Sequence, residues 1–330
     1  MKTFSIVIPR YSEGDLDIFP LLASIGNQVG IDLDSIEVLV VSDKGAVPLT
    51  DVFVDCAKTL TGLDIQLFEL KEHGGPGMAR QKGIDEAHGK WIMCCDADDC
   101  LHNVGVLGAL LEIGENEGAD IVTSSWLEEG VDPNTGKMVY ISHDMDMTWM
   151  HGKLLRRSFL EENEIRHHPD LQVHEDTYFL SIVANLTEKR FHLPNVTYIW
   201  RFGEDSITRR DDAAYRWNSL PTFVDSAVWA MDELERRGIR ECLTYKTVQL
   251  IFYMYYTLHS KEWEDHQDYL SETESHVAAG FGKYMALYRE ADPELIGTTA
   301  ADERAKHFNG TVESETVEGW FERIGLIKQE

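Results

Sequence analysis

The sequence predicts an α/β fold with a mostly parallel, doubly wound central sheet and a helical extension on its C-terminal side. Two observations support this prediction. Short apolar runs alternate with helical patterns in the first half of the chain, and this rhythm stops near Trp149. Alternating strands and helices favour a parallel sheet with right-handed crossovers. A chain of 330 residues suits one large domain plus an extension, so we expect domains at residues 1–212 and 213–330.

Five short runs rich in apolar and β-branched residues predict the strands. They lack strict alternation of apolar and polar positions, which is typical of strands covered on both faces. In chain order they are residues 4–9, 37–41, 65–70, 90–95 and 120–126.

Helical patterns lie between these strands and dominate the second half. The first four are residues 16–28, 51–60, 79–88 and 104–117, and glycine follows the last two of them, as it often does at helix ends. Further helices are predicted at residues 152–163, 174–186, 243–258 and 317–326. Residues 243–258 are apolar nearly all round, which predicts burial or a homodimer contact through the C-terminal helices.

The bulk composition narrows the classes of function. The chain has 58 acidic and 30 basic residues, a formal net charge of −28, which repels nucleic acid and anionic lipid at long range. Five cysteines without a C-x-x-C pair disfavour a zinc site. Residues 248–258, the strongest apolar stretch, are too short to span a bilayer, which takes about 20 residues. The first residues do not read as a signal peptide, so we expect a cytoplasmic protein with reduced thiols.

Three aspartates, Asp96, Asp98 and Asp99, follow the fourth predicted strand directly. In open α/β sheets, ligands bind outside the carboxyl ends of the strands. Carboxylates crowded together repel one another, and a divalent cation relieves the conflict. Hard oxygen ligands favour Mg²⁺ or Mn²⁺. The structural alternative is a solvated turn, in which aspartate is common.

A glycine-rich segment precedes this strand. Gly74, Gly75 and Gly77 lead into a helix that carries Arg80 and Lys82. A helix N-terminus attracts anions, and the two cations add to that attraction. Together with the acidic cluster one strand later, this segment suggests a nucleoside diphosphate bridged to a metal ion.

The ordered set of motifs resembles the family 2 glycosyltransferases of the GT-A fold. The resemblance covers roughly residues 3–210 and rests on the segments "SIVIPRY", "VVSDKG", "GPGMARQKG", "DADD", "KLLRRSFL" and "HEDTYF". Ser42 stands where the family usually has a first aspartate, and Gln81 replaces the usual asparagine. The helical remainder has no counterpart in the resemblance.

The resemblance implies a role for each matching residue on the donor side. Pro9, Tyr11 and Asp43 would hold the nucleotide base. An acid can accept the imide N–H of a pyrimidine, which favours a nucleotide such as UDP. Gly77 and Arg80 would contact the nucleotide or its diphosphate, and Asp96 would face the ribose. The metal ligands would be Asp98 and Asp99.

On the acceptor side, the resemblance implies that Asp176 is the general base and that Glu175 orients the acceptor. A carboxylate within reach of the acceptor hydroxyl can take its proton as the oxygen attacks the anomeric carbon, and a single displacement inverts that carbon. Trp149, His151 and His174 would line the acceptor, although core packing accounts for the tryptophan equally well.

Several alternatives remain open from sequence. A nucleotidyltransferase also uses paired acids on a doubly wound domain, but it needs a stronger basic loop near the N-terminus. An inactive relative would only bind a saccharide. The acceptor is expected to be a saccharide, with a modified DNA base or a protein side chain as alternatives. The net charge of −28 disfavours DNA, because DNA binding draws on Lys and Arg contacts to phosphates.

Overall fold

The computed structural model describes residues 2–203, 214–263, 266–308 and 315–327. The chain divides into two compact units, Met1–Arg209 and Arg210–Glu330, and each is described by itself. The domain boundary predicted at residue 212 lies outside the described residues. Within the described residues, no helix combines the length and the apolar character that crossing a bilayer requires.

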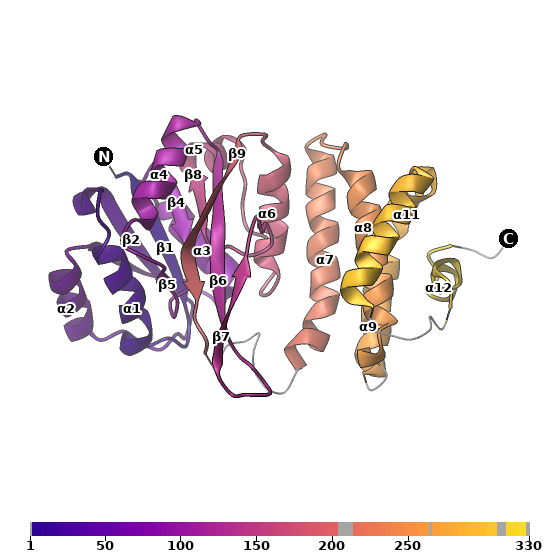
Figure 1. Ribbon diagram of the computed structural model, residues 1–330, viewed down its shortest axis with the longest axis horizontal. Helices are drawn as coiled ribbons and strands as arrows, with labels where there is room; N and C mark the ends of the chain where they lie inside the picture. Colours follow the sequence, from indigo (N-terminus) through magenta and orange to yellow (C-terminus); the bar gives the residue numbers. More distant parts are fainter. Residues whose placement is uncertain (1, 204–213, 264–265, 309–314, 328–330) are drawn as a thin grey trace. The chain divides into compact units, whose positions relative to one another are not determined.

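Unit 1 is built on a nine-stranded mixed sheet with the order β3-β2-β1-β4-β8-β6-β9-β5, in which β7 pairs with β6 (Figure 1). Strands β1 to β4 are parallel to one another, whereas β8 runs antiparallel to both of its neighbours. The strands are β1 (Phe4–Arg10), β2 (Ile36–Ser42), β3 (Asp64–Glu69), β4 (Trp91–Cys94), β5 (Cys100–Leu101), β6 (Ile121–Val131), β7 (Met138–His143), β8 (Lys153–Arg156) and β9 (Arg190–Trp200).

Helices cover both faces of this sheet because its central strands are apolar on both sides. Every residue of β1 is buried. Phe4, Ile6 and Ile8 belong to one core with the helices α1 (Asp15–Gly26), α2 (Asp51–Thr61) and α4 (Val106–Asn116). Helix α3 (Gly75–Glu86) packs on the other side of β1 and β2 and also contacts α6 (Glu175–Asn185).

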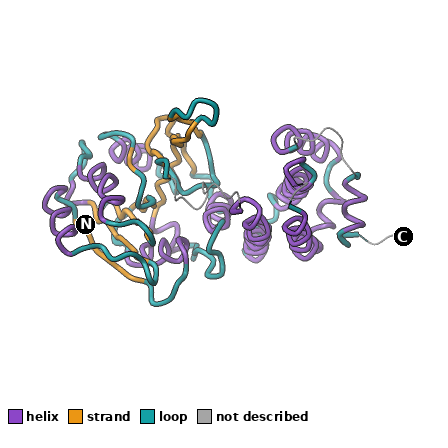
Figure 2. The backbone as a smooth tube through the Cα atoms, turned by 90° about the horizontal axis from the view of Figure 1, so that it is seen from below, coloured by secondary structure: helices purple, strands orange, loops and turns teal. Residues whose placement is uncertain are grey.

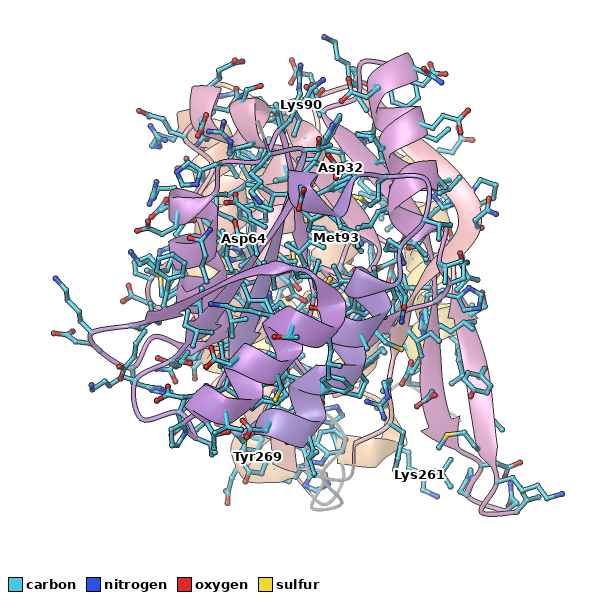
Figure 3. The ribbon with its side chains drawn as sticks, turned by 90° about the vertical axis from the view of Figure 1, so that its left-hand side faces the viewer. Asp32, Asp64, Lys90, Met93, Lys261 and Tyr269 are labelled. Atoms are coloured by element: carbon cyan, nitrogen blue, oxygen red, sulfur yellow. The ribbon has the colours of Figure 1, made fainter. Side chains whose placement is uncertain are left out.

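The approach of α3 to the sheet is close. A Cβ built at Gly83 would lie only 2.3 Å from Cγ1 of Val7, so only glycine fits between this helix and β1. The sheet interior itself is closely filled. Met93 on β4 lies among interior side chains, whereas Lys90, just ahead of the strand, lies near the outer edge (Figure 3). This packing fixes the start of α3 relative to the carboxyl ends of the strands.

The strands and helices predicted for the first 126 residues are confirmed, with ends that differ by a few residues. The helix predicted at residues 152–163 is wrong in its first part. Lys153–Arg156 forms β8 between β4 and β6, and only Arg157–Glu162 is helical (α5). Leu154 and Leu155 are fully buried in the sheet, so tertiary packing overrides the local helical pattern.

Three further strands, β5, β7 and β9, were not predicted. Strand β7 forms an antiparallel hairpin with β6, and β9 runs parallel to β6 with a register shift near Pro194. A bulge of this kind interrupts the two-residue alternation by which a strand is recognised.

Unit 2 is helical within the described residues, and the strands are confined to unit 1 (Figure 2). Its helices are α7 (Ala214–Arg236), α8 (Leu243–Leu258), α9 (Gln267–Phe281), α10 (Met285–Glu290), α11 (Pro293–His307) and α12 (Val317–Arg323). Helix α8 contacts α7, α10 and α11 and supplies much of the core of this unit. Its apolar composition is therefore explained within one chain, and the homodimer stays a prediction.

The contact between Gly83 and Val7 can be tested by adding one methyl group. We expect Gly83→Ala to lower the free energy of unfolding by about 1–3 kcal/mol, because an overpacked core strains its neighbours. Gly108→Ala is the matched control, since its Cβ would lie 3.7 Å from the nearest atom, the carbonyl oxygen of Val29. Because alanine favours the helix over glycine, we expect that change in α4 to raise the free energy of unfolding by no more than about 1 kcal/mol. Urea denaturation measures both, and a neutral Gly83→Ala would contradict the packing.

Candidate functional site

The candidate site lies at the carboxyl ends of the parallel strands of unit 1. Tyr11 follows β1, Asp43 follows β2, and Asp96, Asp98 and Asp99 follow β4. Because parallel strands end at the same edge of a sheet, residues far apart in sequence meet there. The N-terminal turns of α3 and α6 complete this edge with Arg80 and the pair Glu175 and Asp176.

Arg80 is buried at the centre of the site, with 6% of its side chain exposed. Its Nη2 donates to Oδ1 of Asp96 over 2.7 Å, and its Nη1 donates to Oε1 of Glu175. Although burial opposes the charge, the two carboxylates raise the pKa of Arg80 above its usual value. One guanidinium thus joins the turn after β4 to the start of α6.

Gly77 makes this junction sterically feasible. A Cβ at Gly77 would lie 2.7 Å from Cγ of Glu175, so the missing side chain lets α6 approach α3. Gly77 is buried, and its surroundings include the ring of His167, which is stacked on Phe179. The structure therefore shows a packing reason for this glycine, and its predicted contact with the nucleotide stays a prediction.

Asp99 is fully buried and held by Tyr198 of β9 and by Arg201, the residue that follows this strand. The hydroxyl of Tyr198 donates to its Oδ2 over 2.6 Å, and the N–H of Arg201 donates to its Oδ1 over 2.9 Å. The same hydroxyl accepts the backbone N–H of Asp96. Burial, followed by the charges of Asp96 and Asp98, raises the pKa of Asp99 well above its usual range.

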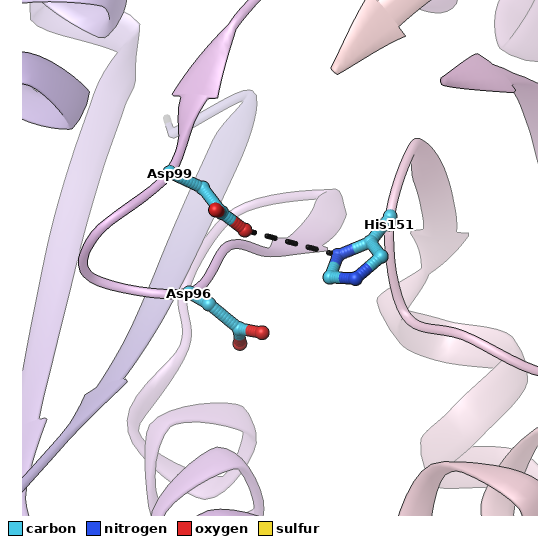
Figure 4. Close-up of side chains that lie close together, drawn as sticks. All are labelled: Asp96, Asp99 and His151. Carbon is cyan, nitrogen blue, oxygen red and sulfur yellow. Dashed lines mark ion pairs between the residues drawn. The ribbon is translucent and has the colours of Figure 1, made fainter. Parts of the chain in front are cut away.

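Asp96, Asp99 and His151 form a cluster that could hold a metal ion (Figure 4). One ligand atom from each residue lies within 4.8 Å of the others, and Nδ1 of His151 is 4.0 Å from Oδ2 of Asp99. The imidazole is 4% exposed, and burial lowers its pKa to about 4, so it is neutral, as a ligand must be. Its Nε2 has no hydrogen-bond partner among the described residues. These donors fit Mn²⁺ or Mg²⁺.

Asp98 stands apart from this cluster. Its carboxylate lies near Gly203, where a Cβ would be 3.7 Å from Oδ2. Burial, Asp96 and Glu13 raise its pKa to about 6. The predicted pair of metal ligands, Asp98 and Asp99, is therefore divided between a half-buried side chain at the turn and a fully buried one.

Glu175 and Asp176 begin α6, directly after a strained residue. His174 has φ of 57°, a left-handed conformation that is uncommon for a residue other than glycine. The carboxylate of Asp176 accepts the N–H of Thr177 over 2.8 Å. Burial, with the neighbouring Glu175, raises the pKa of Asp176 to about 8. One of the two acids is thus paired with Arg80, and the other holds its proton near neutral pH.

Aromatic rings gather beside the candidate metal-binding cluster of Asp96, Asp99 and His151. The ring of Trp149 is stacked on His151 with 5.9 Å between centroids, and it lies 5.1 Å from Trp200. His151 is also stacked on Tyr198 at 4.9 Å. The structure thus brings Trp149 and His151 together and places His151 against Asp99 as well. Their contact with the acceptor stays a prediction.

Asp43 is buried behind the loop that leads into α3. It accepts N–H groups from Lys44, Gly74 and Gly75, and Nδ1 of His73 lies 2.8 Å from its Oδ2. The anion at the glycine-rich helix start is therefore Asp43 itself. Pro9 is buried in β1, and Tyr11 beside it in sequence is 50% exposed.

Sequence reasoning missed Tyr198 and Lys153. Tyr198 links Asp96 to Asp99 but lies on β9, which was not predicted as a strand. The buried ammonium of Lys153 donates to the carbonyl oxygens of Trp149 and His151 and so holds their loop. For Lys153, the one signal available in the sequence was a lysine at the start of an apolar run.

The hydroxyl of Tyr198 provides a test of the acid cluster. We expect Tyr198→Phe to lower the free energy of unfolding by about 1–3 kcal/mol, because the buried carboxylate of Asp99 and the N–H of Asp96 lose their partner. Tyr140→Phe removes a hydroxyl from a 58% exposed ring and should change stability by no more than about 0.5 kcal/mol. Equal effects of the two changes on urea denaturation would contradict the arrangement.

Comparisons with known proteins identify the family of this chain and its fold. The sequence model of the family "Glycosyl transferase family 2" matches residues 5–172. The chain is 23% identical over 273 residues to the succinoglycan biosynthesis protein ExoO of Rhizobium meliloti (strain 1021), covering 73% of this chain and 75% of that protein.

Solved structures share the fold at low sequence identity. S. aureus TarS 1–349 in complex with UDP-GlcNAc has a TM-score of 0.64 at 18% identity, covering 94% of this chain and 93% of that chain. The mannosyltransferase PcManGT from Pyrobaculum calidifontis, in complex with GDP-Man and Mn²⁺, has a TM-score of 0.50 at 14% identity, covering 98% and 84%. The family match spans more than half of the chain, and this protein therefore belongs to the family 2 glycosyltransferases, with a GT-A-type fold.

Proposed function

We propose that this glycosyltransferase is metal-dependent and inverting, and that it transfers a sugar from a UDP-linked donor to a hydroxyl of a saccharide. One observation carries the proposal. Arg80 joins the acids after β4 to the acids of α6, so that a cation-binding set and a candidate base share one edge of the sheet. We assign this chemistry to unit 1, the predicted catalytic domain.

On the donor side, we propose that Pro9, Tyr11 and Asp43 contact the nucleotide base and that Asp96 faces the ribose. UDP-GlcNAc and GDP-Man are bound in two proteins of the same fold, which supports a nucleotide-sugar donor. Arg80 is committed to two carboxylates, which supports a positioning role for it, and its contact with the diphosphate stays a prediction.

For the metal, we propose Asp96, Asp99 and His151 as ligands, with Asp98 available from the same turn. A divalent ion bound there would neutralise charge on the departing diphosphate. The cluster suits such an ion because its two carboxylates, of which Asp99 is fully buried, repel each other and its imidazole is neutral. Mn²⁺ and Mg²⁺ both fit oxygen-rich sites, and a histidine nitrogen favours Mn²⁺.

On the acceptor side, we propose Asp176 as general base. Its carboxylate would take the proton of the acceptor hydroxyl while that oxygen forms a bond to the anomeric carbon. The bond from this carbon to the diphosphate oxygen breaks with its electron pair on the leaving group, and the configuration inverts. Glu175, fixed by Arg80, would orient the acceptor, and the aromatic ring of Trp149 offers a face for a sugar.

Removing one ligand at a time tests the metal site. We expect Asp99→Asn and His151→Gln each to weaken Mn²⁺ binding at least about tenfold, because the removed atoms would be ligands of the ion. Mn²⁺ titration followed by electron paramagnetic resonance measures this directly, and release of UDP from UDP-sugars should stop in excess chelator.

The control is Glu162→Gln, which removes an exposed carboxylate on α5. Unchanged Mn²⁺ affinity in all three variants would contradict the ligand assignment. Full activity in chelator would contradict metal dependence.

The raised pKa of Asp176 makes a prediction about pH. Because a base must be deprotonated, kcat/KM should rise as the pH rises through about 8 and level off above it. Asp176→Asn should reduce turnover by at least about a hundredfold and remove this ascending limb.

The same change should stabilise the fold. The folded protein keeps the proton of Asp176 from the usual aspartate pKa of about 3.9 up to about 8, whereas the unfolded chain loses it, so stability falls with rising pH in this window. We therefore expect Asp176→Asn to raise the midpoint of thermal unfolding more at pH 8 than at pH 5. Thr177→Ala, next to it on α6, is the control, and a pH-independent shift would rule out the proposed titration.

A further inference from the structure

Tyr11, Asp43 and His73 come from three different loops and lie together where we propose that the nucleotide base binds. Tyr11 follows β1, Asp43 follows β2, and His73 lies in the loop between β3 and α3. The rings of Tyr11 and His73 lie 5.5 Å apart at 54°. The side chain of His73 is 52% exposed, whereas that of Asp43 beneath it is 4% exposed.

The acceptor capacity of Asp43 is fully used. A carboxylate offers about four lone-pair positions. Oδ1 accepts the N–H groups of Lys44 at 2.7 Å and Gly74 at 3.0 Å, and Oδ2 accepts the N–H of Gly75 at 2.8 Å. Nδ1 of His73 lies 2.8 Å from the same Oδ2, so the imidazole covers the fourth position.

These four partners differ in how easily they can leave. Three are backbone N–H groups, and two of those belong to the start of α3, where a released N–H has no partner within the helix. His73 is the one partner that contacts Asp43 through a side chain, and that side chain is 52% exposed. The neighbouring ring is that of Tyr11, which is itself half exposed. Among the described partners of Asp43, His73 is therefore the one that can be exchanged.

We propose that His73 covers Asp43 until a nucleotide base displaces it, and that this exchange sets which nucleotide base the donor site accepts. This inference rests on the proposed function, in which Asp43 recognises the base. A base whose edge carries a ring N–H, such as uracil, can replace the N–H of His73. Cytosine presents a ring nitrogen lone pair at the same place and would be repelled by the carboxylate. The ring of Tyr11, half exposed, flanks the position that His73 vacates.

The test is UDP binding by isothermal titration calorimetry at fixed Mn²⁺, with CDP as the comparison ligand. His73→Ala should tighten UDP binding by roughly two- to fivefold, the range in which exposed ion pairs contribute. CDP binding should not change. Glu72→Ala, an exposed neighbour on the same loop, should leave both affinities as they are.

A double-mutant cycle with Asp43→Asn tests whether the gain in affinity depends on the carboxylate that His73 covers. The gain from His73→Ala should disappear in the Asp43→Asn background, because no carboxylate remains to be freed. An equal gain in both backgrounds, or weaker UDP binding in His73→Ala, would overturn the proposal, since the latter means that the imidazole stacks on the base. If Asp43→Asn impairs folding, the comparison of UDP with CDP in His73→Ala still decides.

Failure of the proposed function has a different signature. If neither the wild-type protein nor His73→Ala binds any of UDP, GDP and dTDP, both proposals are wrong. If UDP binds and Asp43→Asn leaves its affinity unchanged, the proposal of a nucleotide-sugar donor stands and the proposal that His73 covers the base-binding carboxylate is wrong.

Discussion

One buried guanidinium holds the candidate site together. Arg80 shares its charge between Asp96 and Glu175, which lie 16 and 95 residues away in sequence. Removing one partner of such a buried pair leaves an uncompensated charge, which is why these contacts are costly to break. The turn that carries the aspartates and the helix that carries the candidate base are therefore positioned by the same side chain. Gly77 permits this geometry, since any Cβ there would collide with Glu175.

The site has more carboxylates than its buried cation can balance. Arg80 lowers the pKa of Asp96, but burial and neighbouring acids raise the pKa of Asp98, Asp99 and Asp176. Without a further cation these carboxyl groups hold their protons more tightly than ordinary aspartates, and the fold is less stable for holding them together. Protein sites commonly give up stability in this way for the sake of function. A divalent ion would restore balance on the β4 side and leave Asp176 as the group that titrates.

The aromatic residues show how one set of side chains can serve packing and recognition together. His151 lies between Trp149 and Tyr198, and its imidazole also approaches Asp99. From the sequence, Trp149 and His151 were expected to contact the acceptor, with core packing as the alternative for the tryptophan. The structure shows that His151 is buried among core side chains and is also a candidate metal ligand. Its Nε2 has no hydrogen-bond partner among the described residues, so the neutral imidazole can still donate an electron pair to an ion.

The sequence by itself determined the alternation of strands and helices, the apolar strands covered on both faces, and the acids placed at the end of β4. These follow from local pattern, since periodicity and glycine positions act over a few residues. Only the tertiary structure decided that residues 153–156 form a strand, that Tyr198 bridges Asp96 and Asp99, and that His73 covers Asp43. Tyr198 and Asp99 are 99 residues apart, and no local pattern encodes their contact. Such contacts arise where strands distant in sequence become neighbours in the sheet, because burial of the whole apolar surface selects the pairing that no single segment can specify.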